Sequence, residues 1–489
     1  MKNSSNNEVA IIGGGPAGLT AAYELLKLSE AHKVTVYEGG DLVGGIARTE
    51  THKGYRFDIG GHRFFTKVPE VEQMWKDVLG DEFITVPRLS RIYYRNKFFS
   101  YPLKLTNALA QIGLYESFRI LISYLKWKVV PHKKEDTFEQ WVINRFGGRL
   151  YMHFFKSYTE KVWGIPPSSI QADWAAQRIK DLSLTKVIWN AISGANDTSS
   201  LIEEFQYPRL GPGQMWERTV EEIEDRGGIV VMQSPIVRIS RNGNRVISID
   251  RQTGDGKLET IEADHFINSM AIKDLVLAMD PPPPAPVLAA ARKLKYRDFL
   301  IVTLVLDHKD PFPDNWIYVH SPGVKVGRIQ NFRAWSADML PNRETASIGM
   351  EYFCQEGDGL WTMSDEDLRI LAAEELDTLG LADKRCVIDA AVIRQPKAYP
   401  VYDEDYQDAV DTLKTWITSL ENFQSVGRNG LHRYNNQDHS MLTAMLASQN
   451  ILGANHDLWS VNVERSYHEE FKVKEAKSLL PTTTLQTEK

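Results

Sequence analysis

Cysteine, excess positive charge and long apolar runs are all scarce in this sequence. Only Cys354 and Cys386 occur in 489 residues, and neither stands in a metal-ligand spacing, so no disulfide framework or zinc site is indicated. The formal net charge of −7 provides no global positive field for nucleic acid or an anionic membrane, so a bound anion needs a local cluster. The sequence has no apolar run of the about 18 residues that a membrane span needs, and no signal-peptide core. We therefore expect a globular cytoplasmic protein without a transmembrane segment and without nucleic acid as a partner.

Glycine stands where the chain needs bare backbone. A short apolar strand at residues 9–12 runs into "GGGPAG", which is followed by a helical pattern, a second strand and Glu38. In such a unit the glycines allow a tight turn, the approach of a pyrophosphate and close packing of helix on strand, and the acid accepts ribose hydroxyls. The residues predicted to bind a dinucleotide here are Gly13, Gly15, Pro16, Ala17, Gly18 and Glu38.

A second group of glycines lies just beyond this unit, in "GGDLVGGIART" and in "FDIGGHRFF" at residues 57–65. This succession resembles the flavin amine-oxidase superfamily, in which the arginine helps to neutralise the pyrophosphate and the second glycine pair lies along the flat isoalloxazine ring. The alternative is a glycine-rich turn in which His62 is a solvated or capping residue. The residues of these segments that are expected to contact the cofactor are Gly45, Arg48, Gly60, Gly61 and His62. Val237 in "SPIVRIS" is expected to contact it as well.

The rest of the chain predicts a helical insertion, a return to the nucleotide-binding unit with a turn at Asn242-Gly243, a stiff "DPPPPAP" connector, and a second sheet. Strands of that sheet are expected in "FLIVTLVLD", "NWIYVHSP", "GRIQNFRAW" and "ASIGMEYFC". The predicted fold class is α/β, a Rossmann-like FAD-binding domain with a helical insertion and an antiparallel-sheet substrate domain. The expected boundaries are 1–102 (FAD-binding, first part), 103–205 (helical insertion), 206–280 (FAD-binding, second part), 281–400 (substrate domain), 401–475 (FAD-binding, C-terminal part) and 476–489 (flexible tail).

Six motifs sharpen the resemblance. "GGHRFF", "SYTEKVWGIPPSSIQADWAAQRIKDLSL", "INSMAIKDLV", "NWIYV" followed by Arg328, "AYPVYD" and "HRYNNQDHSM" occur in this order. Together they are similar to UDP-galactopyranose mutases of the eukaryotic-like kind, over the whole chain except the tail. The resemblance implies FAD as the cofactor, active in its reduced form, with NADH or NADPH as external reductant and a nucleoside-diphosphate sugar as substrate. It leaves the oligomeric state open.

The resemblance also implies roles for individual residues. Catalytic roles fall on arginines that flank the diphosphate or lie near the substrate, and on the loop histidine near the flavin. Planar guanidinium forks suit adjacent phosphates, and tyrosine hydroxyls add contacts without charge. The expected catalytic residues are His62, Arg178, Arg328 and Arg433, and the expected substrate-binding residues are Tyr101, Thr159, Trp163, Tyr318, Tyr399, Tyr434 and Asn436.

The polar sequence "RYNNQDHSM" directly precedes a helical pattern. A helix N-terminus attracts negative charge and offers amides, so we expect it to face the flavin. A simple helix cap by Asp438 is a compatible alternative. The residues expected to contact the cofactor here are Asn436, Gln437, Asp438, Ser440 and Met441.

Three residues depart from the eukaryotic-like mutases. The pair Tyr101-Pro102 is followed by leucine and lysine where those enzymes tend to hold uracil with an aromatic residue and an amide, and Thr159 replaces an asparagine. Trp163 is retained. The base and the sugar therefore stay open.

The implied reaction uses reduced flavin as a nucleophile toward the sugar, without net oxidation. The alternative is a redox enzyme of the same superfamily, such as an amine oxidase, a protoporphyrinogen oxidase or a desaturase. These enzymes would share every flavin motif and differ in the substrate pocket. A third possibility is a flavin-bound protein without catalytic activity.

Overall fold

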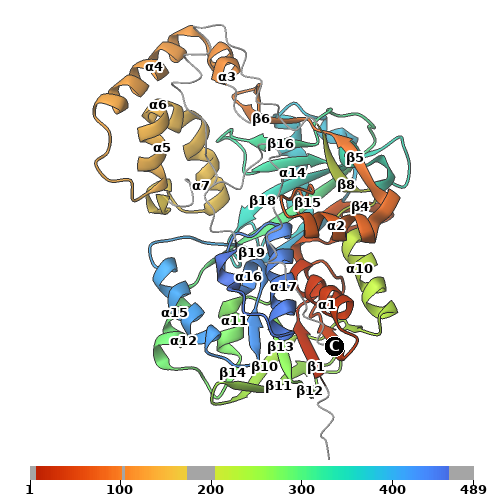
Figure 1. Ribbon diagram of the computed structural model, residues 1–489. Helices are drawn as coiled ribbons and strands as arrows, with labels where there is room; N and C mark the ends of the chain where they lie inside the picture. Colours follow the sequence, from red (N-terminus) through yellow and green to blue (C-terminus); the bar gives the residue numbers. More distant parts are fainter. Residues whose placement is uncertain (1–6, 102–104, 173–203, 462–489) are drawn as a thin grey trace, which may run out of the picture.

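The computed structural model describes residues 7–101, 105–172 and 204–461. Figure 1 shows a nucleotide-binding unit below, a second sheet at the upper right and a group of helices at the upper left. Arg178 and the expected tail at 476–489 lie outside the described residues. In the part of the chain that is described, no helix combines the length and the apolarity needed to cross a bilayer.

The nucleotide-binding unit is built on a parallel five-stranded sheet, and the predicted Rossmann-like fold is confirmed. Side chains alternate along β1, so that Val9 and Ile11 face one core while Ala10 and Ile12 face another. Helices α1 (Pro16–Leu28), α2 (Pro69–Leu79), α10 (Gly213–Asp225) and α17 (Gln437–Ile451) bury side chains in the first core. The strand order is β20 (Phe423–Ser425), β13 (His265–Asn268), β1 (Asn7–Ile12), β2 (His32–Tyr37) and β9 (Ile229–Val231).

A smaller sheet and three helices complete the second core. The predicted turn at Asn242-Gly243 is confirmed, because β10 and β11 pair antiparallel across it and Gly243 has a φ of 60°. The sheet contains β12 (Leu258–Glu262), β11 (Arg245–Gln252), β10 (Ile236–Asn242) and β14 (Met279–Asp280). The helices are α11 (Ile272–Leu277), α12 (Ala285–Lys293) and α15 (Tyr406–Thr418).

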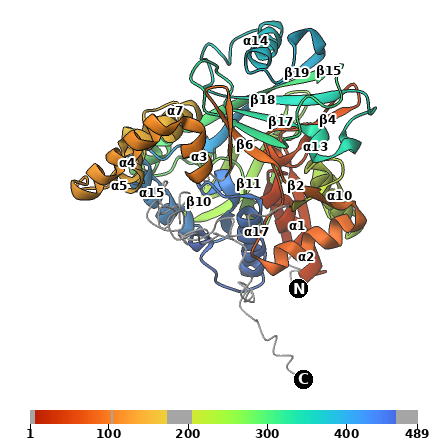
Figure 2. The same cartoon turned by 90° about the horizontal axis from the view of Figure 1, so that it is seen from above.

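The second sheet has seven strands, antiparallel except for the parallel pair β16–β6. Helix α14 (Asp365–Thr378) packs on β15 and β19. Figure 2 shows this sheet from above, with α14 on its outer side. The strand order is β19 (Val387–Pro400), β15 (Tyr296–Leu306), β18 (Ala346–Cys354), β17 (Arg328–Asn331), β16 (Trp316–Val319), β6 (Ser90–Tyr94) and β7 (Lys97–Ser100).

Three sequence-based expectations need correction here. Residues 90–100, expected in the first FAD-binding part, extend the seven-stranded sheet because β6 pairs with β16. Helix α12, expected in the substrate domain, packs on α11 and α15 of the nucleotide-binding unit through buried Val287 and Ala291. The strand expected over "GRIQNFRAW" ends at Asn331, and the helical turn α13 (Phe332–Trp335) follows it. In this turn the side chains of Phe332 and Trp335 are both buried in the core.

The helical insertion comprises α3 (Leu105–Ile112), α4 (Leu114–Val129), α5 (Phe138–Phe146), α6 (Gly148–Tyr151), the π-helical turn η3 (Met152–Lys156) and α7 (Ser157–Trp163). Thr137 caps α5 by accepting from the Gln140 amide, and the Gln140 side chain returns a contact to the cap. The described part of the insertion shares its core with the seven-stranded sheet, and α7 faces that sheet.

Asp58 joins several of these segments from a buried position. It ends β4 (Tyr55–Asp58), accepts from Thr49 Oγ1 of β3 (Thr49–His52) at 3.1 Å, and accepts from the Tyr207 hydroxyl of β8 (Glu204–Pro208). Strand β8 pairs with β5 (Phe83–Pro87). Burial raises the pKa of Asp58 to about 7, against the lowering effects of the two hydrogen bonds and of Arg56.

Substitution Asp58→Asn should remove a pH dependence of stability. In the folded protein Asp58 keeps its proton up to about pH 7, whereas an aspartate in the unfolded chain loses it with a pKa of about 3.9. The stability that this proton contributes is therefore fully present below about pH 4 and is lost as the pH rises to about 7. Urea unfolding should therefore show wild type losing stability relative to the variant between about pH 4 and about pH 7. An equal difference between the two proteins at both pH values would contradict this assignment.

Candidate active site

The turn after β1 is closed by contacts that leave no room for side chains. Gly13 has a φ of 98°, and a Cβ there would lie 2.3 Å from Ser269 Oγ. A Cβ on Gly18 would lie 1.8 Å from the Gly13 carbonyl oxygen. Around Gly15, by contrast, the nearest atom to an added Cβ is 3.8 Å away, in Gly45. Gly15 thus presents accessible backbone at the N-terminus of α1, which suits a pyrophosphate.

Glu38 stands at the carboxyl end of β2 beside this turn. Its carboxylate accepts from the Gly14 amide at 2.6 Å and from the Gly40 amide at 2.7 Å. A carboxylate has about four acceptor positions, so two bonds orient it and leave capacity for ribose hydroxyls. Val237 lies on β10 two residues beyond Pro235, which contacts Gly39, so its backbone is near the ribose end of the site.

Arg48 is held at the opposite side of the glycine turn. Its Nη1 donates to the Gly45 carbonyl at 2.9 Å and to Gln395 Oε1 at 2.7 Å, and its Nε donates to Glu50 at 2.6 Å. Arg48 is predicted to neutralise the pyrophosphate, and the carboxylate of Glu50 compensates part of its positive charge. The position beside Gly45 fits that role.

The N-terminus of α17 supplies the third part of the candidate cofactor site. Asn436 is its N-cap, and the Oε1 atom of Gln437 is buried and accepts no hydrogen bond from the described residues. An unsatisfied buried oxygen points to a missing donor. The Ser440 amide donates to the Asn436 carbonyl, and the Met441 sulfur accepts from Trp75 Nε1, so Met441 packs in the core. The Ser440 amide is thus engaged within the helix, and the expected contacts of Ser440 and Met441 with the flavin stay predictions.

The glycine pair of "FDIGGHRFF" has a structural reason that the sequence did not reveal. A Cβ on Gly61 would lie 2.0 Å from Cζ3 of Trp316, so the flat ring against this glycine is an indole of the protein itself. Gly60 has a φ of 89°, and its carbonyl faces His62 Nδ1 at 3.0 Å. Gly61 therefore serves the packing of the second sheet.

His62 is neutral in this arrangement. Burial lowers its pKa to about 3, and the charges of Arg428 and Arg328 act in the same direction, while the contact with Gly60 opposes them. A carbonyl only accepts, so Nδ1 carries the proton of the neutral ring. The Nε2 atom is then an acceptor.

Arg328 is the buried cation at the centre of the second sheet. Its Nε donates to Glu351 at 2.5 Å and its Nη2 donates to the Tyr399 hydroxyl at 2.7 Å. Gln330 Nε2 donates to the other oxygen of Glu351 at 2.5 Å. The rings of Trp316 and Phe353 lie 5.3 and 4.8 Å from the guanidinium carbon, which is cation-π geometry.

Aromatic rings line one side of this cation. Trp316 and Tyr318 stack with centroids 5.3 Å apart, and Tyr318 stacks on Tyr101 at 4.3 Å. Tyr399 stacks on Tyr434 at 5.6 Å, and Trp163 meets Tyr399 edge-on at 6.4 Å. The structure thus brings together the aromatic residues predicted from separate motifs. Thr159 is buried on α7 beside them.

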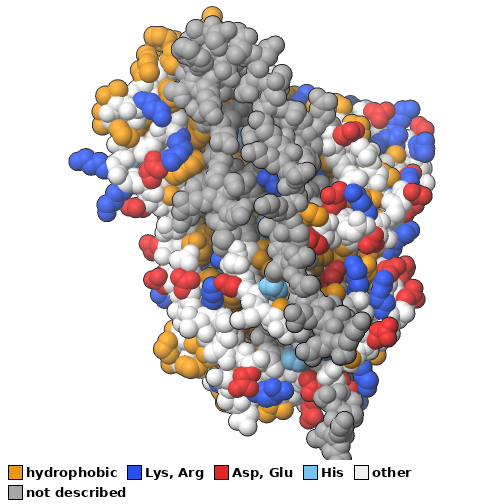
Figure 3. Space-filling view, in the orientation of Figure 1, with side chains coloured by type: hydrophobic (Ala, Val, Ile, Leu, Met, Phe, Trp, Pro, Cys, Tyr) orange, Lys and Arg blue, Asp and Glu red, His pale blue; other side chains and the backbone are white. Residues whose placement is uncertain are grey.

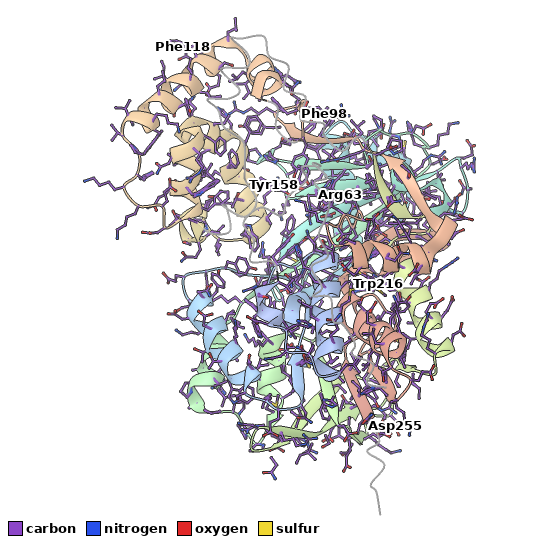
Figure 4. The ribbon with its side chains drawn as sticks, viewed as in Figure 1. Arg63, Phe98, Phe118, Tyr158, Trp216 and Asp255 are labelled. Atoms are coloured by element: carbon purple, nitrogen blue, oxygen red, sulfur yellow. The ribbon has the colours of Figure 1, made fainter. Side chains whose placement is uncertain are left out.

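Tyr158 belongs to this group although it was not predicted. It stacks on His320 with centroids 4.5 Å apart and meets Tyr318 edge-on at 5.8 Å. Burial raises its pKa well above the ordinary value, so it keeps its proton and can donate. Figure 4 shows Tyr158 on the side of the insertion that faces the second sheet. The only sequence signal was its position next to Thr159 in "SYTEKVW".

Two arginines lie in residues 427–437, the predicted Arg433 and Arg428, for which the sequence predicted no role. Arg433 Nη1 donates to the carbonyls of Trp459 and Val461, at 2.6 and 2.8 Å. Arg428, on the single turn α16 (Gly427–Gly430), lies over Tyr434 at 4.6 Å and near Tyr399 at 5.8 Å. Its Nε donates to the Asn435 carbonyl at 2.8 Å. Arg428 thus contacts the predicted tyrosines, while Nη1 of Arg433 is held by carbonyls of the last described segment, and the expected diphosphate contact of Arg433 stays a prediction.

The glycine turn with Glu38 beside it, together with a second sheet that holds the cation Arg328, fits a flavin-dependent enzyme. Residues 16–399 match the family of flavin containing amine oxidoreductases, and the chain belongs to this family. The family implies FAD, and the glycine turn, Glu38 and Gln437 fit that cofactor.

Curated relatives match over short stretches. Coproporphyrinogen III oxidase of Mycobacterium leprae is 37% identical over 68 residues, which are 14% of this chain and 15% of that protein. Protoporphyrinogen oxidase 2 of Arabidopsis thaliana is 28% identical over 154 residues, 30% of each chain. The chain thus matches less than a third of the length of these two relatives.

Solved structures match over nearly the whole chain. Reduced UDP-galactopyranose mutase has a TM-score of 0.80 at 20% identity and covers 92% of this chain and 97% of its own. A putative protoporphyrinogen oxidase from Exiguobacterium sp. 255-15 has a TM-score of 0.68 at 16% identity and covers 92% and 100%. At such identities the likeness is one of fold.

The cofactor prediction can be tested with matched glycine variants. The purified protein should release FAD on denaturation, while Gly18→Ala should lose most of it because the added Cβ meets the Gly13 carbonyl. Gly254→Ala is the control, since an added Cβ there meets no atom within 4 Å. Flavin absorbance per protein after reconstitution is the measurement. Full FAD occupancy in Gly18→Ala, or no flavin in wild type, would contradict the assignment.

Proposed function

We propose that this protein is an FAD-dependent mutase that interconverts the pyranose and furanose forms of a nucleoside-diphosphate sugar similar to UDP-galactose. The observation that carries this proposal is the cation Arg328, buried among tyrosine hydroxyls and aromatic rings. Such a pocket suits an anionic, hydrophilic substrate, because a guanidinium fork pairs with phosphate oxygens and phenols bond to sugar hydroxyls. The fold shared with reduced UDP-galactopyranose mutase is compatible with it.

The cofactor would lie between the glycine turn, Glu38 and the N-terminus of α17. Reduced FAD, when bound, would supply the nucleophile for the anomeric carbon. Residues 13–18, Arg48 and Gln437 would bind and orient it, and NADH or NADPH would serve as the external reductant. Arg178 belongs to the proposed catalytic set but lies outside the described residues.

The chain's own residues would hold the substrate and stabilise the leaving diphosphate. Arg328 and Arg428 are the proposed diphosphate partners, because both lie against the pair Tyr399 and Tyr434. Neutral His62 would accept a hydrogen bond from a substrate hydroxyl at Nε2. The sugar would lie against the proposed wall of Tyr101, Tyr158, Thr159, Trp163, Tyr318 and Asn436.

A redox function is the second candidate, and the relatives favour it. The family is named for amine oxidoreductases, and the two curated relatives described above are porphyrinogen oxidases. An oxidase would use oxidised FAD and consume an electron acceptor in each turnover. A mutase needs its flavin reduced before turnover but consumes no electron acceptor. An oxidase therefore requires oxygen or another acceptor, whereas a mutase works without one.

Anaerobic turnover separates the two candidates. Dithionite-reduced protein, without oxygen or acceptor, should isomerise a member of a panel of nucleoside-diphosphate sugars over many turnovers, with products resolved by chromatography. The oxidised protein should be inactive on the same panel. If instead the reduced protein is inert and the oxidised protein consumes oxygen with an amine, a porphyrinogen or a polyene, the mutase proposal is wrong.

Three arginine variants test the diphosphate site. Arg428→Ala and Arg328→Lys should each weaken sugar-nucleotide binding by more than about tenfold, because a desolvated charge contact typically contributes about 2 to 5 kcal/mol. Arg433→Ala should change the affinity less than about threefold, since Arg433 bonds to backbone carbonyls. Titration by flavin fluorescence gives the dissociation constants. Loss of affinity in Arg433→Ala alone would reverse the assignment of the two arginines.

A further inference from the structure

Helix α4 carries an apolar stripe on the outside of the helical insertion that none of the elements in residues 7–101, 105–172 and 204–461 covers. Leu114, Phe118, Leu125 and Val129 are 90, 62, 54 and 80% exposed. Their spacing of four, seven and four residues places them on one helical face. Figure 4 shows Phe118 at the outer edge of α4, and Figure 3 shows hydrophobic side chains gathered at this edge of the molecule.

Cations border this stripe on both sides. At 3.6 residues per turn, Lys128 flanks the stripe on one side, while Arg119 and Lys126 flank it on the other. All three side chains are exposed, although Arg119 also lies 3.7 Å from Glu116, and the following loop carries exposed Lys133 and Lys134 beside exposed Glu135 and Asp136. Long cationic side chains at such borders keep their charge in water while their stems cover apolar surface.

The one acidic residue of α4 faces inward. Glu116 bonds to Arg149 and to His153 Nε2, the latter at 2.9 Å, and His153 Nδ1 bonds to the Tyr94 hydroxyl at 3.0 Å. Arg149 holds the pKa of Glu116 at about 2, against the effect of its burial. The helix is thus fixed in rotation, with its acid turned to the core and its apolar and cationic side chains turned out.

The charges argue against a second copy as the occupant of this face. A twofold contact would place the same patch on both partners, so the cations of one α4 would meet those of the other. Because α4 exposes no opposing acid, such a dimer would be repelled electrostatically. An anionic surface with an apolar interior satisfies both features of the stripe at once.

We infer that the outer face of α4 is a docking surface for an anionic lipid bilayer. The helix lies in the plane of the interface, with the stripe inserted at the level of the acyl chains and the flanking cations at the lipid phosphates. The net charge of −7 does not oppose this contact, because a local cluster acts within about one Debye length of 8 to 10 Å.

Co-sedimentation of the full-length FAD-loaded protein with vesicles tests the inference. Binding should be strong to phosphatidylcholine vesicles with about 30% phosphatidylserine and weak to phosphatidylcholine alone. Phe118→Glu/Leu125→Glu should lower the partition coefficient more than about a hundredfold, since it removes apolar contact and adds repulsion. Lys126→Ala/Lys128→Ala should lower it about twentyfold at low salt, because each cation near the surface contributes about fivefold.

The control is Leu258→Glu/Ile388→Glu, which changes two apolar residues of similar exposure, 56 and 58%, outside α4. It should bind vesicles like wild type, and all variants should keep their flavin and their melting temperature. Equal loss in the control would mean that general charge, not α4, determines binding. Absence of vesicle binding overturns the inference. If the wild type is then a dimer and Phe118→Glu/Leu125→Glu is a monomer, a second copy of the chain covers the stripe. If the wild type is a monomer and the variant has a lower melting temperature, another part of the same chain covers it.

Discussion

The charge of Arg328 inside the protein is the constraint on which the rest of the seven-stranded sheet depends. A guanidinium does not lose its proton, so its burial requires an opposing charge. Glu351 lies directly opposite on β18, in the register that pairs the two residues, and Gln330 holds its second oxygen. A slip of one residue would turn Arg328 to the other face of the sheet and leave two buried charges unpaired. The strand register places the two charges opposite each other, and the ion pair in turn stabilises that register.

The aromatic wall follows from the same sheet. Trp316 and Tyr318 are two residues apart on β16, so both project from one face, and the indole covers Gly61. That contact ties the loop after β4 to the second sheet and sets His62 near the two cations. Arg328 in turn binds Tyr399, which connects the centre of the sheet to its edge strand β19. Residues from distant segments thus become one site through contacts between side chains.

Local patterns could be predicted from the sequence, and long-range pairings could not. The turn after β1 depends on glycines five residues apart, so their spacing was sufficient to predict it. The pairing of β6 with β16 and the packing of Trp316 on Gly61 join residues more than 200 positions apart, and no local signal marks them. Arg428 and Arg433 share one short segment, yet the carbonyls that hold Arg433 lie near residue 460, so only the fold distinguishes their roles.

The balance of charge in the site favours an anion over an amine. Glu351 compensates Arg328, whereas the hydrogen bonds that orient Arg428 go to carbonyls that carry no formal charge. His62 adds no positive charge, because burial and both arginines keep it neutral. Beside Tyr399 and Tyr434, Glu351 is thus engaged by Arg328, and the hydrogen bonds of Arg428 do not go to a carboxylate. A protonated amine would meet repulsion there, while a diphosphate would be attracted, since such interactions strengthen in a site shielded from water. Within a family named for amine oxidation, the uncharged partners of Arg428 are the observation that supports the proposed anionic substrate.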